Sequence, residues 1–116
     1  MAAAPWSSLF AHDRPALIGV LHLPPLPGSP RWQGDFEAVR RFALADAAAY
    51  LAGGADGLVV ENFGDAPFFA SAVPSHTVAA MARIAAEVVE AAAGVPVGIN
   101  VLRNDAQAAI GIAAAS

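Results

Sequence analysis

Three short apolar runs recur along the chain, separated by longer segments in which apolar residues return at helical spacing. The runs cover residues 16–22, 58–60 and 97–102, and each passes into polar residues within a few positions. Short runs rich in Val, Leu and Ile are typical of strands that are buried on both faces of a parallel sheet. The pattern therefore predicts three strands with polar side chains at their carboxyl ends.

Helices are predicted after each of these strands. Apolar residues recur at helical spacing over 36–50 and 78–92, and a third helical segment reaches Ser116. The expected boundary residues are Asp35, Gly53 and Gly54 for the first helix, Pro74, Ser75 and Gly94 for the second, and Asn104 or Asp105 as the cap of the third. Alternating strands and helices at this spacing predict a parallel α/β sheet with right-handed crossovers.

A proline-rich segment, residues 22–30, follows the first predicted strand. Its four prolines are incompatible with a helix interior and with pairing in a sheet, so the segment is predicted to be a stiff loop. Because it directly follows a strand, we interpret it as a wall over a site. The alternative is a proline-rich segment that docks onto a partner.

The composition is that of a small globular domain, with 57% hydrophobic and 14% charged residues among 116. A formal net charge of −4 argues against a nucleic-acid partner, which needs a clustered basic face. The absence of cysteine and lysine excludes thiol and Schiff-base chemistry in these residues. We expect a cytoplasmic protein without an integral membrane segment, since no apolar stretch reaches the roughly 18 residues that a span needs.

The predicted organisation is an irregular lead-in over residues 1–15 followed by three βα units over residues 16–116. An eightfold α/β barrel needs about 250 residues, so three units are too few to close one. An outer strand would then keep an unpaired edge. We therefore expect the chain to be a piece of a longer protein.

Four segments carry a resemblance to a known family. They read GVLHLPPLPGSPR over 19–31, GGADGLVVENFGDAPF over 53–68, TVAAM over 77–81 and GINVLRNDA over 98–106. In this order they resemble the BtpA family, which is named for a role in photosystem I biogenesis. The resemblance implies a ribulose-phosphate-binding-like (β/α)8 TIM barrel, of which this chain would be the first three βα units.

Two strand-end residues are candidate catalytic groups, Glu61 as the acid or base and His22 as its partner or as a ligand. Glu61 directly follows a buried apolar run, where an ionised carboxylate is costly unless it is paired or proton-shifted. Its alternative role is an ion pair with Arg103. His22 ends the first strand and, by alternation, would lie at the barrel mouth as an acid, base or metal ligand. Its alternative is a hydrogen bond to the proline-rich loop.

Five further residues are candidates for substrate binding. The amides of Asn62, Asn100 and Asn104 suit a sugar hydroxyl or carbonyl oxygen, although Asn104 serves equally well as a helix cap. Asp65 suits a ligand or an ordinary turn, and Arg103 suits a phosphate or carboxylate. A hard cation held by His22, Glu61, Asp65 and Asp105 has no close-spaced ligand motif behind it, so no metal site is predicted.

These residues support two functional hypotheses. The first is a barrel that binds or converts a small phosphorylated or sugar-like metabolite at the carboxyl ends of its strands. The second is a non-catalytic assembly or stability factor for photosystem I. No nucleotide-binding motif occurs, and the sequence leaves the cofactor unknown. Besides a small-molecule ligand, we expect the full-length protein to have copies of itself as partners in a homo-oligomer.

Overall fold

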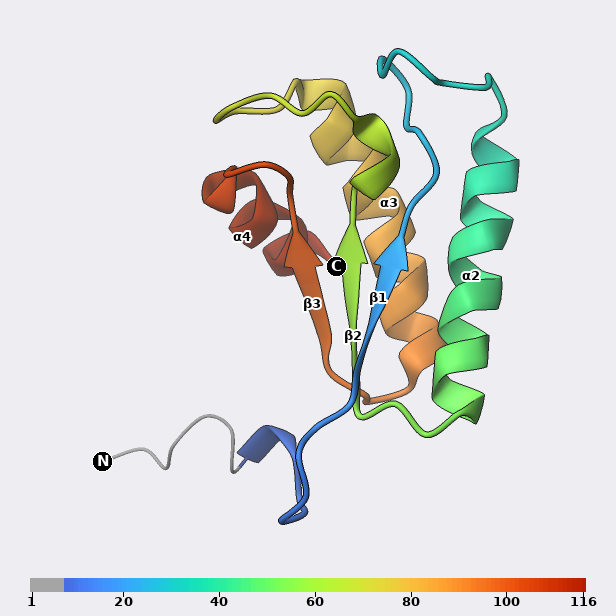
Figure 1. Cartoon of the computed structure of the whole chain (residues 1–116), viewed down its shortest axis with the longest axis vertical. Helices are drawn as coiled ribbons and strands as arrows, with labels where there is room; N and C mark the ends of the chain where they lie inside the picture. The colour runs from blue at the N-terminus through green and yellow to red at the C-terminus, as the bar shows by residue number, and fades with distance from the viewer. Residues whose placement is uncertain (1–7) are drawn as a thin grey trace.

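The computed structural model describes residues 8–116, and within them strands and helices alternate as the sequence predicts (Figure 1). The predicted lead-in lies before the first strand, and its residues 1–7 are outside the described part. The elements are β1 (Ile18–His22), α2 (Phe36–Ala52), β2 (Gly57–Glu61), the 3₁₀ turn η1 (Phe63–Asp65), α3 (Ser75–Ala92), β3 (Val97–Asn100) and α4 (Ala106–Ala115).

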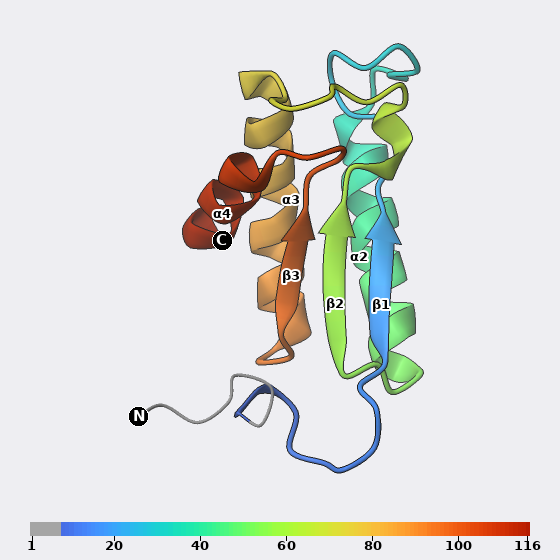
Figure 2. The same ribbon diagram turned by 60° about the vertical axis from the view of Figure 1, so that its left-hand side comes forward.

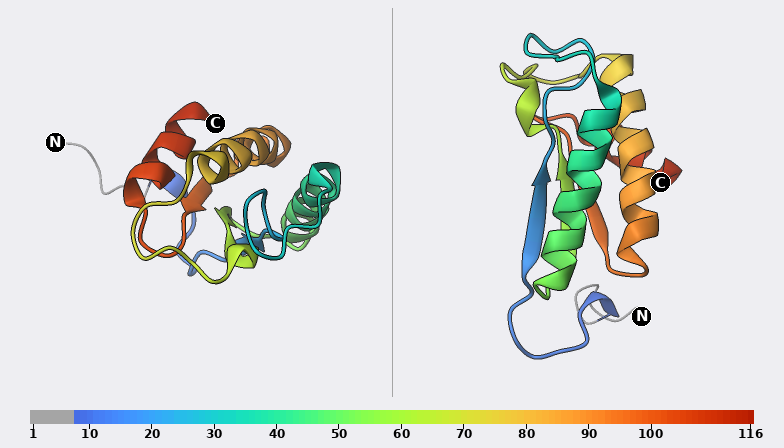
Figure 3. Two further views of the ribbon diagram at one scale, coloured as in Figure 1. Left: turned by 90° about the horizontal axis from the view of Figure 1, so that it is seen from above. Right: turned by 90° about the vertical axis from the view of Figure 1, so that its right-hand side faces the viewer.

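The strands form one parallel sheet in the order β1-β2-β3, and the long helices cover one of its faces (Figures 2 and 3). Side chains alternate across the sheet, so Leu21, Leu58 and Val60 are buried toward the helices. Val20 and Val59 lie on the other face and are only partly buried. The predicted parallel α/β architecture is therefore confirmed, and no described helix covers this second face, which we call the open face.

The core lies between the sheet and the helices. It is built from strand side chains and from the inward faces of α2, α3 and α4. Its fully buried members include Leu21, Leu58, Val60, Ala43, Ala47, Met81, Ile84, Ala85, Val88 and Ile112. None of the helices between residues 8 and 116 has the length and hydropathy that crossing a lipid bilayer requires.

The helix boundaries follow the predicted capping residues. The Asp35 carboxylate accepts a hydrogen bond from the Ala38 amide at 3.0 Å, as an N-cap does. The third helix is capped by Asp105, which accepts from the Ala108 amide at 2.9 Å. Of the two caps considered from the sequence, Asp105 is therefore the one used.

The proline-rich segment is an ordered loop that is tied to β2 and η1. Only two residues between Leu23 and Pro27 have a backbone N–H, and both donate: Leu23 to the Glu61 carbonyl at 2.9 Å, and Leu26 to Oδ1 of Asp65 at 2.8 Å. The Leu23 and Leu26 side chains are buried in the core. A loop with its apolar side chains turned inward fits the predicted wall better than a partner-docking segment.

Gly64 allows η1 to lie directly on this loop. Its amide donates to the Leu23 carbonyl at 2.9 Å. A Cβ at this position would come within 2.5 Å of the Pro25 nitrogen, a backbone atom that has little room to move. Glycine is therefore required here by the close approach of two backbones.

Asn62 ties the carboxyl end of β2 to the segment after β3. Its side chain is 1% exposed, and its Oδ1 accepts from the Leu102 amide at 2.7 Å. Its Nδ2 donates to the Leu102 carbonyl at 3.3 Å. This one amide therefore satisfies both polar groups of a backbone unit that has left the sheet.

Asp56 has the corresponding role at the opposite end of the sheet. Its carboxylate accepts from both terminal nitrogens of Arg14 at 2.8 Å, from the Leu17 amide at 2.7 Å and from His12 Nε2 at 3.0 Å. The bonds from Arg14 are the main reason that the pKa of Asp56 lies well below its usual range. The cluster fastens the segment before β1 to the turn that precedes β2.

Removing the Asn62 clamp should destabilise the protein. Asn62→Ala leaves the Leu102 amide and carbonyl without a partner in a partly buried place, which costs about 2–3 kcal/mol in the free energy of unfolding. Urea denaturation followed by circular dichroism measures this loss. Asn104→Ala is the control, because Asn104 is exposed and has one long hydrogen bond, to the Ala70 carbonyl at 3.3 Å. Equal stability of the two variants would contradict the clamp.

The Asp56 cluster should make stability depend on acid pH. A carboxyl group with a lowered pKa contributes stability above its ordinary pKa of about 4, and this contribution disappears as the pH falls. The urea midpoint of the unsubstituted protein should therefore fall between about pH 5 and about pH 3, and the fall should be smaller in Asp56→Asn. Asp13→Asn, which alters an exposed neighbouring carboxylate, should keep the full decline. A decline that persists in Asp56→Asn would assign it to other groups.

Candidate functional site

The carboxyl ends of the strands bring three predicted residues into one row. The strand register pairs His22 with Glu61 and Glu61 with Asn100. All three therefore lie at the same level on neighbouring strands, and their side chains lie on the open face. We call His22, Glu61 and Asn100 the strand-end row.

Glu61 is the centre of this row and contacts both neighbours. Its Oε1 accepts from Asn100 Nδ2 at 2.6 Å, and its Oε2 lies 3.1 Å from His22 Nε2. The Glu61 side chain is 14% exposed, whereas the His22 side chain is 53% exposed. The partly buried carboxylate is thus paired on both oxygens, and the imidazole is the member of the pair that solvent reaches more easily.

The partners of the row differ from the alternatives considered from the sequence. Glu61 pairs with His22 and Asn100, and no ion pair joins it to Arg103 among the described residues. The His22 ring lies against the ring of Phe63, with their centroids 4.6 Å apart. The imidazole is therefore positioned by the Glu61 carboxylate and the Phe63 ring. The sequence offered one signal for this contact, because Phe63 follows the catalytic candidate Glu61 by two positions.

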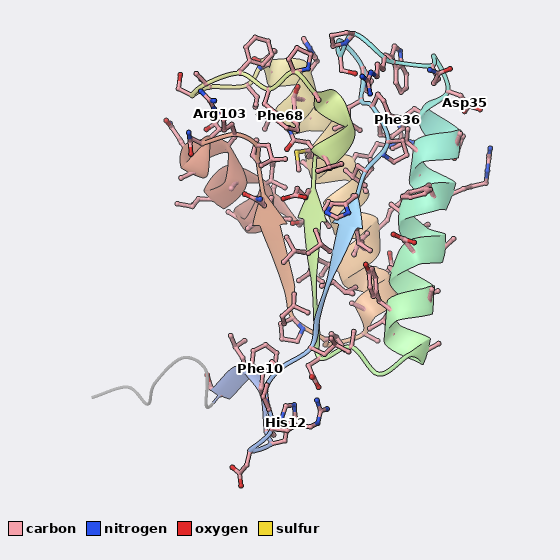
Figure 4. All side chains as sticks on the ribbon, viewed as in Figure 1. Phe10, His12, Asp35, Phe36, Phe68 and Arg103 are labelled. Atoms are coloured by element: carbon pink, nitrogen blue, oxygen red, sulfur yellow. The ribbon has the colours of Figure 1, made fainter. Side chains whose placement is uncertain are left out.

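Arg103 and Asn104 lie beside the row on the turn between β3 and α4. A shallow hollow of about 240 Å³ brings them together with Asn100, Asp105 and the first residues of α4. The Asn104 side chain donates to the Ala70 carbonyl, and the exposed Arg103 lies at the carboxyl end of the sheet, by the turn between β3 and α4 (Figure 4). Three of the predicted binding residues thus share one surface.

Asn62 and Asp65 lie on the other side of the strand end. Asn62 is used by the Leu102 backbone, and Asp65 holds the proline-rich loop through the Leu26 amide. Burial raises the pKa of the Asp65 carboxyl, against the opposing effect of the Leu26 hydrogen bond. The structure therefore does not bring these two predicted residues into the row.

Asp105, like Asp65, binds backbone amides and does not join His22 and Glu61. Asp105 accepts from the Ala108 amide and from the Val73 amide, and these two bonds lower the pKa of its carboxyl. Within residues 8–116, no three metal-binding side chains come close enough to form a ligand cluster. The four residues considered as a cation site are thus not gathered in one place.

Two exposed histidines outside the row, His12 and His76, have contacts of interest. His12 is bound to Asp56 at the bottom of the sheet. His76, at the start of α3, lies against Gly28 of the proline-rich loop, where a Cβ would collide with its ring. Neither contact is visible in the local sequence, because each joins residues more than forty positions apart.

The sequence is similar to a family of longer proteins. The profile of the BtpA family matches residues 13–116. An uncharacterised protein of Archaeoglobus fulgidus is 54% identical over 99 residues, which are 85% of this chain and 39% of that protein. An uncharacterised protein of Pyrococcus furiosus is 50% identical over 97 residues, 84% of this chain and 36% of that one.

A third relative has a functional name. The photosystem I biogenesis protein BtpA of Synechocystis is 50% identical over 97 residues, which are 84% of this chain and 33% of that protein. The chain thus spans between a third and two fifths of the length of these three relatives. No solved structure matches the sequence significantly. The family match over nearly the whole chain shows that this protein belongs to the BtpA family.

Proposed function

We propose that the chain supplies the first three βα units of a (β/α)8 barrel and that its strand-end row binds or converts a small phosphorylated or sugar-like metabolite. Parallel α/β proteins bind ligands at the carboxyl ends of their strands, where this row lies. In that barrel the open face would line the interior. The remaining βα units would correspond to the additional length of the relatives. We place the protein in the cytoplasm and expect it to be a homo-oligomer.

The double pairing of Glu61 is the observation that carries the proposal. A carboxylate that is 14% exposed and held by an amide on one oxygen and an imidazole near the other has a fixed orientation. Fixed orientation is what a proton-exchanging group or a hydroxyl acceptor needs. A merely structural carboxylate would more simply bind backbone amides, as Asp65 and Asp105 do in this chain.

The different exposures of His22 and Glu61 indicate different roles for the two side chains. His22, at 53% exposure, meets a ligand on the open face, and Glu61 behind it orients the imidazole. Proton exchange between ligand and protein would then pass through His22, with Glu61 as its partner. The sequence alone favoured the reverse assignment, with Glu61 as the principal acid or base.

Arg103 provides the charge for an anionic end of the ligand. Its guanidinium is exposed beside Asn100, and within the described residues it makes no ion pair. A guanidinium binds phosphate or carboxylate through two parallel hydrogen bonds. A ligand a few ångströms long can therefore reach Arg103 with its anionic group and the row with a hydroxyl.

Substitutions in the strand-end row and at Arg103 should weaken ligand binding without changing the fold. Hydrogen bonds that involve a charged group stabilise by about 1.5–3 kcal/mol, so His22→Ala, Glu61→Gln and Arg103→Ala should each weaken binding of ribose 5-phosphate roughly tenfold to a hundredfold. Isothermal titration calorimetry on the intact gene product measures the affinity, and circular dichroism checks the fold.

Matched variants separate a site effect from a general charge effect. Glu90→Gln removes an exposed carboxylate of α3 far from the strand ends and should leave the affinity unchanged. Arg103→Ala should weaken ribose 5-phosphate but not ribose, which lacks the anionic group. Unchanged affinity in folded row variants would remove the proposed role of these residues.

A second function is favoured by the name of the Synechocystis relative. In this hypothesis the protein assists photosystem I biogenesis without catalysis, and its working surface is the outside of the helical layer. The same scaffold can host either role, so the fold does not choose between them.

Replacement of the relative in Synechocystis tests this second function. If the protein acts through its outer surface, the intact gene product should restore photosystem I content, and His22→Ala and Glu61→Gln should restore it equally well. Low-temperature chlorophyll fluorescence measures the content. Failure of the unsubstituted protein to restore it, while it binds ribose 5-phosphate, would contradict the assembly role.

A further inference from the structure

A cavity of about 350 Å³ lies over the start of α3, on the side of the strand ends opposite the strand-end row. We call it the loop cavity. Phe68 belongs to its rim, on the loop that arches over the first turn of α3 (Figure 4). Its walls come from the proline-rich loop, the segment between β2 and α3, the first turn of α3 and Leu102. A volume of this size is at the lower end of the range for small-molecule pockets.

Two hydroxyl groups in this lining lack hydrogen-bond partners. Thr77 is 5% exposed, and its side chain makes no hydrogen bond to any described residue. Oγ of Ser29 is buried and also has no partner among residues 8–116. The backbone of Ser29 is fully used, because its amide donates to the Leu26 carbonyl and its carbonyl accepts from the Trp32 amide. A buried hydroxyl is normally paired, so Ser29 points to a molecule that completes it, and Thr77 lies in the same lining, where it can bind the same molecule.

The Asp65 carboxylate adds an acceptor to the same cavity. Its Oδ1 is taken by the Leu26 amide at 2.8 Å, whereas its Oδ2 has only a 3.5 Å contact with Asn62 Nδ2. A half-buried carboxylate oxygen with such a weak contact is ready to accept from a ligand hydroxyl. His76 completes the polar part of the lining.

The remaining lining determines what kind of molecule fits. Phe68, Phe69, Pro30 and Pro67 offer apolar surfaces that suit the C–H face of a saturated ring. The lining contains neither lysine nor arginine, so a phosphate or carboxylate group would lie beside Asp65 without a strong cation to balance it. The hydroxyl groups of a ligand can both donate and accept hydrogen bonds. The lining offers them two hydroxyls, a carboxylate and an imidazole as partners.

The loop cavity and the strand-end row are separate sites. Glu61 lies on the open face, whereas the next residue, Asn62, is buried and contributes to the cavity lining. None of the three side chains of the row belongs to the cavity lining. A ligand in the cavity therefore does not contact the row.

We propose that the loop cavity is a second binding site, one that takes an uncharged cyclic polyol of monosaccharide size. The hydroxyl groups of this polyol bind to the hydroxyls of Ser29 and Thr77 and to Oδ2 of Asp65. Phe68 and Phe69 cover its apolar face. The proposal does not depend on the chemistry of the strand-end row.

Saturation-transfer NMR of the intact gene product with glucose and with myo-inositol tests this site. At least one of the two should bind, and Thr77→Val and Ser29→Ala should each weaken it about threefold to tenfold, as loss of one neutral hydrogen bond does. Because the two hydroxyls have no partner in the free protein, both variants should keep or raise the thermal midpoint. Ser71→Ala, an exposed serine outside the lining, should change neither quantity.

Two results would overturn the proposal. One is the absence of binding of both polyols, together with a crystal structure in which an ordered water alone bridges Ser29 and Thr77. The other is equal polyol affinity in Thr77→Val and in the unsubstituted protein. Glu61→Gln should leave polyol affinity unchanged while it weakens ribose 5-phosphate, so failure at either site can be recognised independently of the other.

Discussion

Hydrogen bonding of the backbone beyond the carboxyl ends of the strands is the constraint on which the rest of this structure depends. Where the hydrogen-bond ladder of the sheet stops, each buried backbone N–H and C=O needs a new partner. Asn62 provides it for Leu102, and Asp65 provides it for the proline-rich loop. Asp105 does the same for Val73 and for the first turn of α4. These side chains tie the loops to one another beyond the strand ends, and none of these bonds uses a side chain of the strand-end row.

Two neighbouring residues at the end of β2, Glu61 and Asn62, belong to two different surfaces. Glu61 lies in a polar row that ends in an exposed imidazole and lies close to an arginine. Asn62 belongs to a covered cavity with hydroxyl groups and aromatic rings. An anionic ligand is favoured on the first surface and a neutral one on the second, because only the first has a guanidinium nearby.

Much of this arrangement could be predicted from the sequence, because it follows from local rules. Strand ends, helix caps and the direction of Glu61 depend on periodicity and on residue type at a boundary. The contact of Glu61 with Asn100 follows from the register of neighbouring parallel strands, although the sequence suggested Arg103 as the partner instead. Arg103 lies on the turn after β3 and forms no ion pair with this carboxylate among the described residues, and the geometry of a turn is not encoded in a spacing.

The remaining contacts join residues distant in the chain and could not be predicted in this way. The pairing of Asn62 with Leu102 depends on where two loops cross, and so does the junction of His76 with Gly28. The loop cavity exists only because three loops meet over α3. In the sequence, Ser29 looks like an ordinary turn residue, and only the missing partner of its buried hydroxyl distinguishes it among the described residues.

The central claim is that the strand-end row and Arg103 act as one ligand-binding surface. Amide chemical-shift mapping of the intact protein during titration with ribose 5-phosphate tests it most directly. The account predicts that the shifts concentrate at the ends of β1, β2 and β3 and on the turn that carries Arg103, with little change on α2 or in the loop cavity. Shifts confined to the outer faces of the helices, or none in a folded protein, would contradict it.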